Sequence, residues 1–140
     1  MDISADTLAH VHQLYGAQSH FIDNGDARAW ADTFTADGEF CSPSYPAPVV
    51  GTEKLARFAE DFAAQDGTAR HVITNLFVQQ AGTGLTVRAY LQIVHTPPGG
   101  PSRLVRQTTI TDELVRDDGR WRIRRRTVRR DDAQEETENS

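Results

Sequence analysis

The chain has 140 residues, a mass of 15.6 kDa, a formal net charge of −5 and a single cysteine. No apolar run approaches the roughly 18 residues of a membrane-spanning helix, and one cysteine excludes an internal disulfide or a thiolate metal cage. The N-terminal stretch has neither the basic nor the apolar segment of a secretion signal. We therefore expect a cytoplasmic domain with no membrane partner and a modest core.

The first third of the chain has helical periodicity. Apolar residues recur every three to four positions from Ser4 to about Asp23, which predicts an amphipathic helix with Ser4 as its N-cap. An Asn-Gly-Asp run ends this helix, and its last residue, Asp26, is a candidate cap for a short second helix that includes Trp30 and Phe34. The two helices are expected to form a hairpin.

A short strand over residues 38–41 follows, and then a loop whose three prolines disfavour regular strand pairing. Thr52 is the expected cap of a third helix. After Gly67 the period changes to two, and four segments rich in β-branched and aromatic residues are separated by turn sequences. These segments predict long antiparallel strands over residues 70–80, 85–96, 103–116 and 120–130.

Helices first and a strand meander last indicate an α+β fold, with three N-terminal helices packed on the concave face of a strongly bent antiparallel sheet. Residues 1–130 form this single domain, and residues 131–140 are an acidic tail expected to be disordered. The preceding segment concentrates seven of the arginines between residues 120 and 130. Because Trp121 is the only aromatic residue among them and forms no row of stacking platforms, we interpret the segment as a solvated strand face and expect no nucleic-acid partner.

Strand register decides which side chains face the helices, because a slip of one residue turns every side chain to the opposite face. Pairing centred on the turns places an apolar set inward: Leu91, Ile93, Leu104, Ile110, Leu114, Trp121 and Ile123. The same parity turns a second set inward: His71, Ile73, Asn75, Phe77, His95, Arg106, Thr108 and Asp112. The convex face, which includes Arg122, Arg124 and Arg126, is polar enough to meet water or a partner subunit, and a homodimer is expected there.

Inward polar residues predict a pocket, because an unpaired buried polar group costs about 1–3 kcal/mol. His71 is the candidate general base, since histidine exchanges protons near neutral pH, and Asp23 is the candidate carboxylate that orients its ring. A hydrogen-bonded core histidine and a polar helix end are the alternatives. The histidines match no metal-ligand spacing, and no phosphate loop or nucleophile elbow occurs, so we expect no metal and no cofactor.

Five further residues are candidate substrate contacts: Trp30, Tyr45, Asn75, His95 and Arg106. Arg106 either anchors an anionic or carbonyl group or pairs with Asp112 or Glu113. His95 is either a pocket residue or a rim residue at a strand end. Tyr45 is either a surface aromatic or a phenol donor on a lid.

Four motifs resemble those of one family. They are D-x-G-D followed by W-A-D-x-F-x-x-D-G (23–38), V-G-T-E-K-L-x-x-F (50–58), R-H-x-x-x-N (70–75) and L-V-R-D-D-G-R-W-R-I-x-x-R (114–126). Over residues 5–130 the chain resembles the SnoaL-like branch of the NTF2-like superfamily, which includes scytalone dehydratase, bile-acid 7α-dehydratase, ketosteroid isomerase and polyketide cyclases. The resemblance implies the cone-shaped NTF2-like fold.

The resemblance also implies a cofactor-free mechanism in which His71, held by Asp23, removes a proton α to a carbonyl. Tyr45 or Arg106 would stabilise the enolate oxygen. The chain departs from the family pattern at Ile22, where scytalone dehydratase has a tyrosine, so that position supplies no group to polarise the carbonyl. Dehydration, isomerisation or ring closure of a small, mostly apolar cyclic or polyketide-like molecule in secondary metabolism would follow, as in antibiotic biosynthesis. Two alternatives are a non-catalytic ligand-binding or accessory dimer module and a cofactor-free hydroxylase or epoxide hydrolase, for which Asp23 and Asp112 are the available inward carboxylates.

Overall fold

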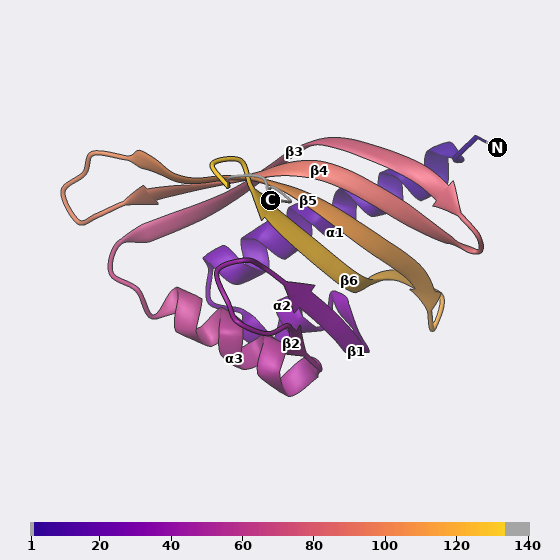
Figure 1. The fold of residues 1–140 in the computed structure, drawn as a ribbon, viewed down its shortest axis with the longest axis horizontal. Coiled ribbons are helices and arrows are strands. Elements are labelled where there is room, and N and C mark those ends of the chain that lie inside the picture. The colour runs from indigo at the N-terminus through magenta and orange to yellow at the C-terminus, as the bar shows by residue number, and fades with distance from the viewer. Residues whose placement is uncertain (1, 134–140) are drawn as a thin grey trace, which may run out of the picture.

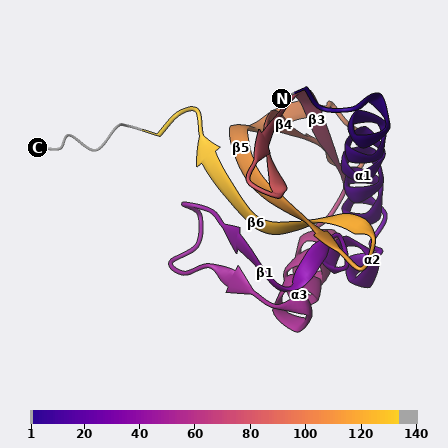
Figure 2. The ribbon, with the colours of Figure 1, turned by 90° about the vertical axis from the view of Figure 1, so that its right-hand side faces the viewer.

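A computed structural model describes residues 2–133 of the chain. Three helices are α1 (Ala5–Asp23), α2 (Ala27–Ala31) and α3 (Thr52–Ala63). Six strands are β1 (Phe34–Cys41), β2 (Val49–Val50), β3 (Thr68–Ala81), β4 (Gly84–Thr96), β5 (Arg103–Asp117) and β6 (Arg120–Arg130). They form one sheet in the order β2-β1-β6-β5-β4-β3. The long strands run side by side (Figure 1), and α1 lies across the open side of the curved sheet (Figure 2). The predicted α+β fold with helices on one side is confirmed.

The helix boundaries follow the predictions closely, with differences at the caps. The Ser4 hydroxyl accepts a hydrogen bond from the Thr7 N–H at 3.1 Å, which confirms the cap of α1. Asp26 occupies the N-cap position of α2 without a side-chain cap bond. The predicted cap of the third helix was wrong, because Gly51, with a φ of 93°, precedes Thr52 as the N-cap. A positive φ at that position favours glycine, which has no Cβ to clash.

The first strand differs from the prediction in its extent and direction. Phe34, predicted to be helical, begins β1, and the last residues of the proline-rich loop pair with β1 through Val49 and Val50. β1 runs parallel to β6, so the sheet is mixed rather than purely antiparallel. The two strands are distant in sequence, and no hairpin turn therefore constrains their relative direction.

Three β-bulges change the predicted faces of the strands. The register of β3 against β4 shifts between Thr74 and Phe77, and Phe77 is 54% exposed rather than buried. A shift between Ile93 and Val94 in β4 accompanies the exposure of Leu104 on β5. A third shift, opposite Glu113 and Leu114, turns Arg126 inward, where it is 3% exposed. One extra residue on a strand reverses the faces of all residues beyond it, so parity counted from the turns fails there.

The core lies between the concave face and the three helices. Leu91, Ile110, Leu114 and Ile123 are buried as predicted. Trp30 from α2 packs on Phe34 with ring centroids 5.0 Å apart, which joins the helices to the sheet. No helix in the part of the chain that the structure describes is long and apolar enough to cross a membrane.

The first residues of the predicted acidic tail contact the sheet. The Asp131 N–H donates to the Gln107 carbonyl at 3.0 Å, and the Asp132 carboxylate pairs with Arg130 at 2.7 Å. Asp131 and Asp132 therefore contact β5 and β6, and disorder of the tail as a whole stays a prediction. Residues 134–140 lie outside the described part of the chain.

Candidate active site

The structure places Asp23 and His71 in direct contact. Asp23 is the last residue of α1, and His71 lies near the start of β3. Asp23 Oδ1 lies 2.7 Å from His71 Nδ1, and both carboxylate oxygens accept from the His71 backbone N–H at 3.1 Å. The carboxylate therefore holds the ring and the strand together. Because it accepts at Nδ1, the neutral imidazole carries its proton on that atom and leaves Nε2 as the basic nitrogen.

His71 lines a cavity of about 170 Å³. Its apolar wall comes from all three helices and from three strands, β1, β4 and β6: Ile22, Trp30, Phe40, Phe58, Phe62, Leu91, Ile93 and Val128. Phe62 packs on the His71 ring with centroids 4.7 Å apart. Asp23 does not line this cavity and lies behind His71, in an adjoining hollow of about 90 Å³. Within residues 2–133, no group of three His, Cys, Asp or Glu side chains is placed to hold a metal ion.

Three of the predicted substrate contacts line the cavity. Trp30 is almost completely buried at its base, and Arg106 reaches it from β5. Tyr45, from the proline-rich loop, is 44% exposed and meets the edge of Phe58 at a centroid distance of 5.5 Å. The loop therefore places Tyr45 at the cavity wall with almost half of its side chain exposed, and a donor role for its phenol stays a prediction.

Two predicted substrate contacts lie elsewhere. Asn75 adopts a φ of 58° within the β3 bulge and lines a hollow on the other face of the sheet, together with Phe77 and Tyr90. The bulge therefore removes Asn75 from the cavity. His95 Nε2 lies 2.7 Å from the Asp66 carbonyl oxygen, and this ring lines the small hollow behind the dyad. His95 thus occupies the rim rather than the cavity.

Sequence parity missed two charged residues of the cavity wall, Arg130 and the more deeply buried Arg126. Its Nε and Nη2 donate to the two Asp112 oxygens at 2.9 and 2.8 Å, and the Tyr15 hydroxyl donates to Asp112 Oδ2 at 2.5 Å. Arg126 also lines the cavity. The sequence carries a signal that Arg126 turns inward. In a regular strand the inward residues are all odd-numbered or all even-numbered, but the apolar residues of β6 change from Ile123 to Val128. This change requires a bulge between them.

Burial and charge set the protonation of this buried triad, Tyr15, Asp112 and Arg126. Burial acts to lower the pKa of Arg126, but the Asp112 carboxylate outweighs it and raises the pKa overall. Burial raises the pKa of Tyr15 well above its usual value of 10.0, and the Asp112 charge adds to this effect. The triad therefore presents a charged guanidinium to the cavity, and Tyr15 remains a hydrogen-bond donor.

Comparison with known proteins identifies similar sequences and structures. A family model described as a SnoaL-like domain matches residues 4–127. The structure of Aln2 from a Streptomyces species is 27% identical, with 94% of this chain and 96% of that chain covered and a TM-score of 0.87. A Catenulispora acidiphila protein solved in complex with S-DNPA is 30% identical, with 91% and 96% covered and a TM-score of 0.82.

A third structure concerns the fold alone. It is an NTF2-like protein with a cystatin-like fold from Novosphingobium aromaticivorans, 22% identical, with 90% of this chain and 82% of that chain covered and a TM-score of 0.81. No curated protein matches the chain.

Proposed function

The chain belongs to the SnoaL-like domain family, and from that premise we propose that it is a cofactor-independent lyase or isomerase that abstracts a proton α to a carbonyl. The observation that carries the proposal is the Asp23–His71 pair, 2.7 Å apart, whose histidine lines a mostly apolar cavity. The fold alone does not select a reaction, so the proposal rests on this geometry.

His71 Nε2 accepts the proton, and the electron pair of the broken C–H bond passes to the carbonyl oxygen as an enolate. Asp23 is a positioning residue that stabilises the imidazolium formed in this step. The imidazolium then returns the proton to a departing β-hydroxyl, which leaves as water, or to another carbon, which moves the double bond. A positioned base contributes about 10²–10⁴ in rate.

Arg126 is our candidate for the group that stabilises the enolate oxygen. It is charged, buried and held by two hydrogen bonds to Asp112, so little reorganisation accompanies the reaction. Removing one preorganised donor of this kind costs about 10²–10³ in rate. Arg106 and Tyr45 also reach the cavity, but both side chains are exposed. We assign them to substrate contact at the mouth.

The lining favours a small, mostly apolar substrate with a carbonyl group, cyclic or polyketide-like. Besides Tyr45, four aromatic side chains and four aliphatic ones surround the polar groups on the cavity wall: Trp30, Phe40, Phe58 and Phe62, with Ile22, Leu91, Ile93 and Val128. The complex of the Catenulispora acidiphila protein with S-DNPA supports a ligand-binding role for a chain of this family.

Deuterium exchange tests proton abstraction without knowledge of the product. The protein is incubated in D₂O with a panel of cyclic ketones and β-hydroxyketones, and loss of the α-proton signal is followed by NMR. We expect His71→Ala to lower the exchange rate about 10²–10⁴-fold and Asp23→Asn to lower it as well. His95→Ala is the matched control, because His95 lies outside the cavity. Exchange at the wild-type rate in His71→Ala would refute the assignment.

A non-catalytic ligand-binding module is the second candidate. Two contacts favour this candidate: the His71 ring packs on Phe62, and the His71 backbone N–H donates a hydrogen bond to the Asp23 carboxylate. Both contacts would also be present if His71 and Asp23 only stabilised the fold. Thermal unfolding separates the two roles. If the pair is structural, replacing both residues with alanine lowers the melting temperature of the protein. If the pair is catalytic, the same replacement leaves the melting temperature unchanged or raises it. Epoxide hydrolysis is less favoured, because no carboxylate of the described residues lines the cavity.

We also propose a homodimer through the convex face. Three large apolar side chains of β3 and β4 are exposed there, namely Val72, Phe77 and Tyr90. Phe77 and Tyr90 line a shallow hollow that also includes Arg88, whose guanidinium lies 5.4 Å from the Phe77 ring centroid. An exposed apolar patch of this kind is typical of an interaction surface.

A further inference from the structure

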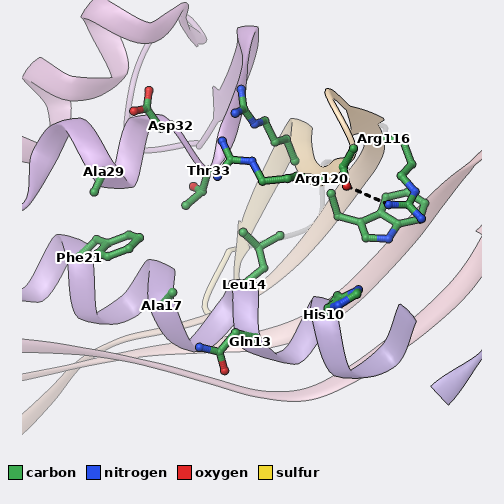
Figure 3. Close-up of a pocket in the computed structure, with 13 residues that line it drawn as sticks. His10, Gln13, Leu14, Ala17, Phe21, Ala29, Asp32, Thr33, Arg116 and Arg120 are labelled. Atoms are coloured by element: carbon green, nitrogen blue, oxygen red, sulfur yellow. Dashed lines mark hydrogen bonds between the residues drawn. The ribbon is translucent and has the colours of Figure 1, made fainter. Parts of the chain in front are cut away.

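A second hollow, larger than the cavity, lies on the opposite side of α1 and α2. It has a volume of about 530 Å³ and is lined by α1, the end of α2 and the hairpin that joins β5 to β6, so we call it the hairpin groove. Figure 3 shows Leu14, Ala17 and Phe21 along α1, facing Thr33 and Arg120 across the hollow.

The hairpin groove and the cavity share no lining residue, because the helices separate them. Neighbouring residues point to opposite sides: Phe21 lines the groove and Ile22 the cavity, and Ala29 lines the groove and Trp30 the cavity. The groove is therefore a separate compartment. A ligand there would not contact His71.

The charge of the groove wall is positive in a chain with a net charge of −5. Arg116, Arg120 and Arg122 line it, against the single carboxylate of Asp32. Two of these arginines are engaged: Arg116 Nη1 donates to the Gly119 carbonyl at 3.0 Å, and Arg122 Nη1 pairs with Asp117 at 3.5 Å. Arg120 has no side-chain hydrogen-bond or ion-pair partner among residues 2–133.

Two buried donors on the same wall lack an acceptor. Trp121 Nε1 and Arg122 Nε are inaccessible to solvent, and no acceptor within residues 2–133 pairs with them. Leaving a buried donor unpaired costs about 1–3 kcal/mol. The floor beneath them is apolar, formed by Leu14, Ala17 and Phe21. The groove therefore combines an apolar floor with an unpaired cation, and its wall also holds two buried donors without acceptors.

We propose that the hairpin groove binds a small amphipathic carboxylic acid. Its apolar body packs on the α1 side of the groove, and its carboxylate faces Arg120, with a second oxygen available to the hairpin wall. A neutral molecule of the same shape would leave the Arg120 guanidinium without a counter-charge, which is why the charge decides the ligand class. This inference is independent of the reaction proposed for the cavity.

The two tryptophans report on the two compartments, because Trp121 lines the groove and Trp30 lines the cavity. Their indole N–H signals in a ¹⁵N-HSQC spectrum of the unaltered protein are assigned with Trp121→Phe. We expect octanoate to shift the Trp121 signal saturably and 1-octanol, of equal chain length, to bind at least tenfold more weakly. Arg120→Gln should weaken octanoate at least tenfold. Arg124→Gln, exposed on the same strand and outside the groove, is the matched control.

Three results would overturn the proposal. They are an unshifted Trp121 signal with octanoate, equal affinity for octanoate and 1-octanol, and unchanged affinity in Arg120→Gln. A saturable shift confined to Trp30 would place the acid in the cavity and would likewise reject the groove as its site. Loss of octanoate binding in Arg124→Gln to the same extent would show a nonspecific charge effect and overturn it too.

Discussion

Replacing Asp112 with asparagine removes the charge from the centre of the buried triad while keeping the side-chain shape. Asp112 is 0% exposed and accepts hydrogen bonds from Arg126 Nε, Arg126 Nη2 and the Tyr15 hydroxyl. An asparagine offers one acceptor oxygen where the carboxylate offers two, and its NH₂ group must face one of the donors. The guanidinium then remains buried without a counter-charge.

Breaking a buried ion pair in this way costs about 3–5 kcal/mol, a large share of the roughly 5–15 kcal/mol that stabilises a domain. The free energy of unfolding is measured by urea denaturation followed by circular dichroism. With an m value of about 2 kcal/mol/M, the midpoint should fall by about 1.5–2.5 M. Glu113→Gln is the matched control on the same strand, because its ion pair with Arg124 is about half exposed and worth about 0–1 kcal/mol.

A second variant tests whether the loss comes from the orphaned charge. Replacing the pair together, Asp112→Leu with Arg126→Met, removes both charges and should recover most of the lost stability. If Arg126 stabilises the enolate, this folded double variant still loses α-proton exchange. A loss below about 1 kcal/mol in Asp112→Asn, equal to that of Glu113→Gln, would refute the view that burial makes this pair strong.

Three further predictions concern pH, assembly and backbone conformation. The pKa of Tyr15 is raised by folding above its usual value of 10.0, so its contribution to stability is full below pH 10 and declines as the pH rises through the folded pKa. Denaturation at pH 9 and pH 11 should show a smaller alkaline loss in Tyr15→Phe, and an equal loss would contradict this. Tyr90→Glu should shift the mass measured by light scattering from dimer to monomer, and an unchanged dimer would exclude this face. Gly51→Ala should destabilise by about 1–3 kcal/mol, because a φ of 93° is strained for alanine. Gly16→Ala, in an open helical position, should stabilise by up to about 1 kcal/mol, and equal effects of the two would contradict the argument.

Local sequence determined the elements and their order. The three-to-four-residue period up to Asp23, the Ser4 cap and the alternation after Gly67 each depend on residues close in the chain, and the elements match those predictions within a few residues. The alternation of strand residues also predicted that the polar His71 faces inward, and the end of the first helix indicated Asp23 as its partner. Both inferences use only local pattern, because helix ends and strand faces repeat with fixed periods.

Tertiary structure decided which side chains meet. The 2.7 Å contact between Asp23 and His71 joins residues 48 positions apart, and no local pattern specifies such a distance. The bulges reversed parity, so that Asn75 left the cavity and Arg126 entered it. The parallel pairing of β1 with β6 likewise depends on packing between distant segments. Periodicity describes a strand relative to itself, whereas a site depends on how separate elements are placed against one another.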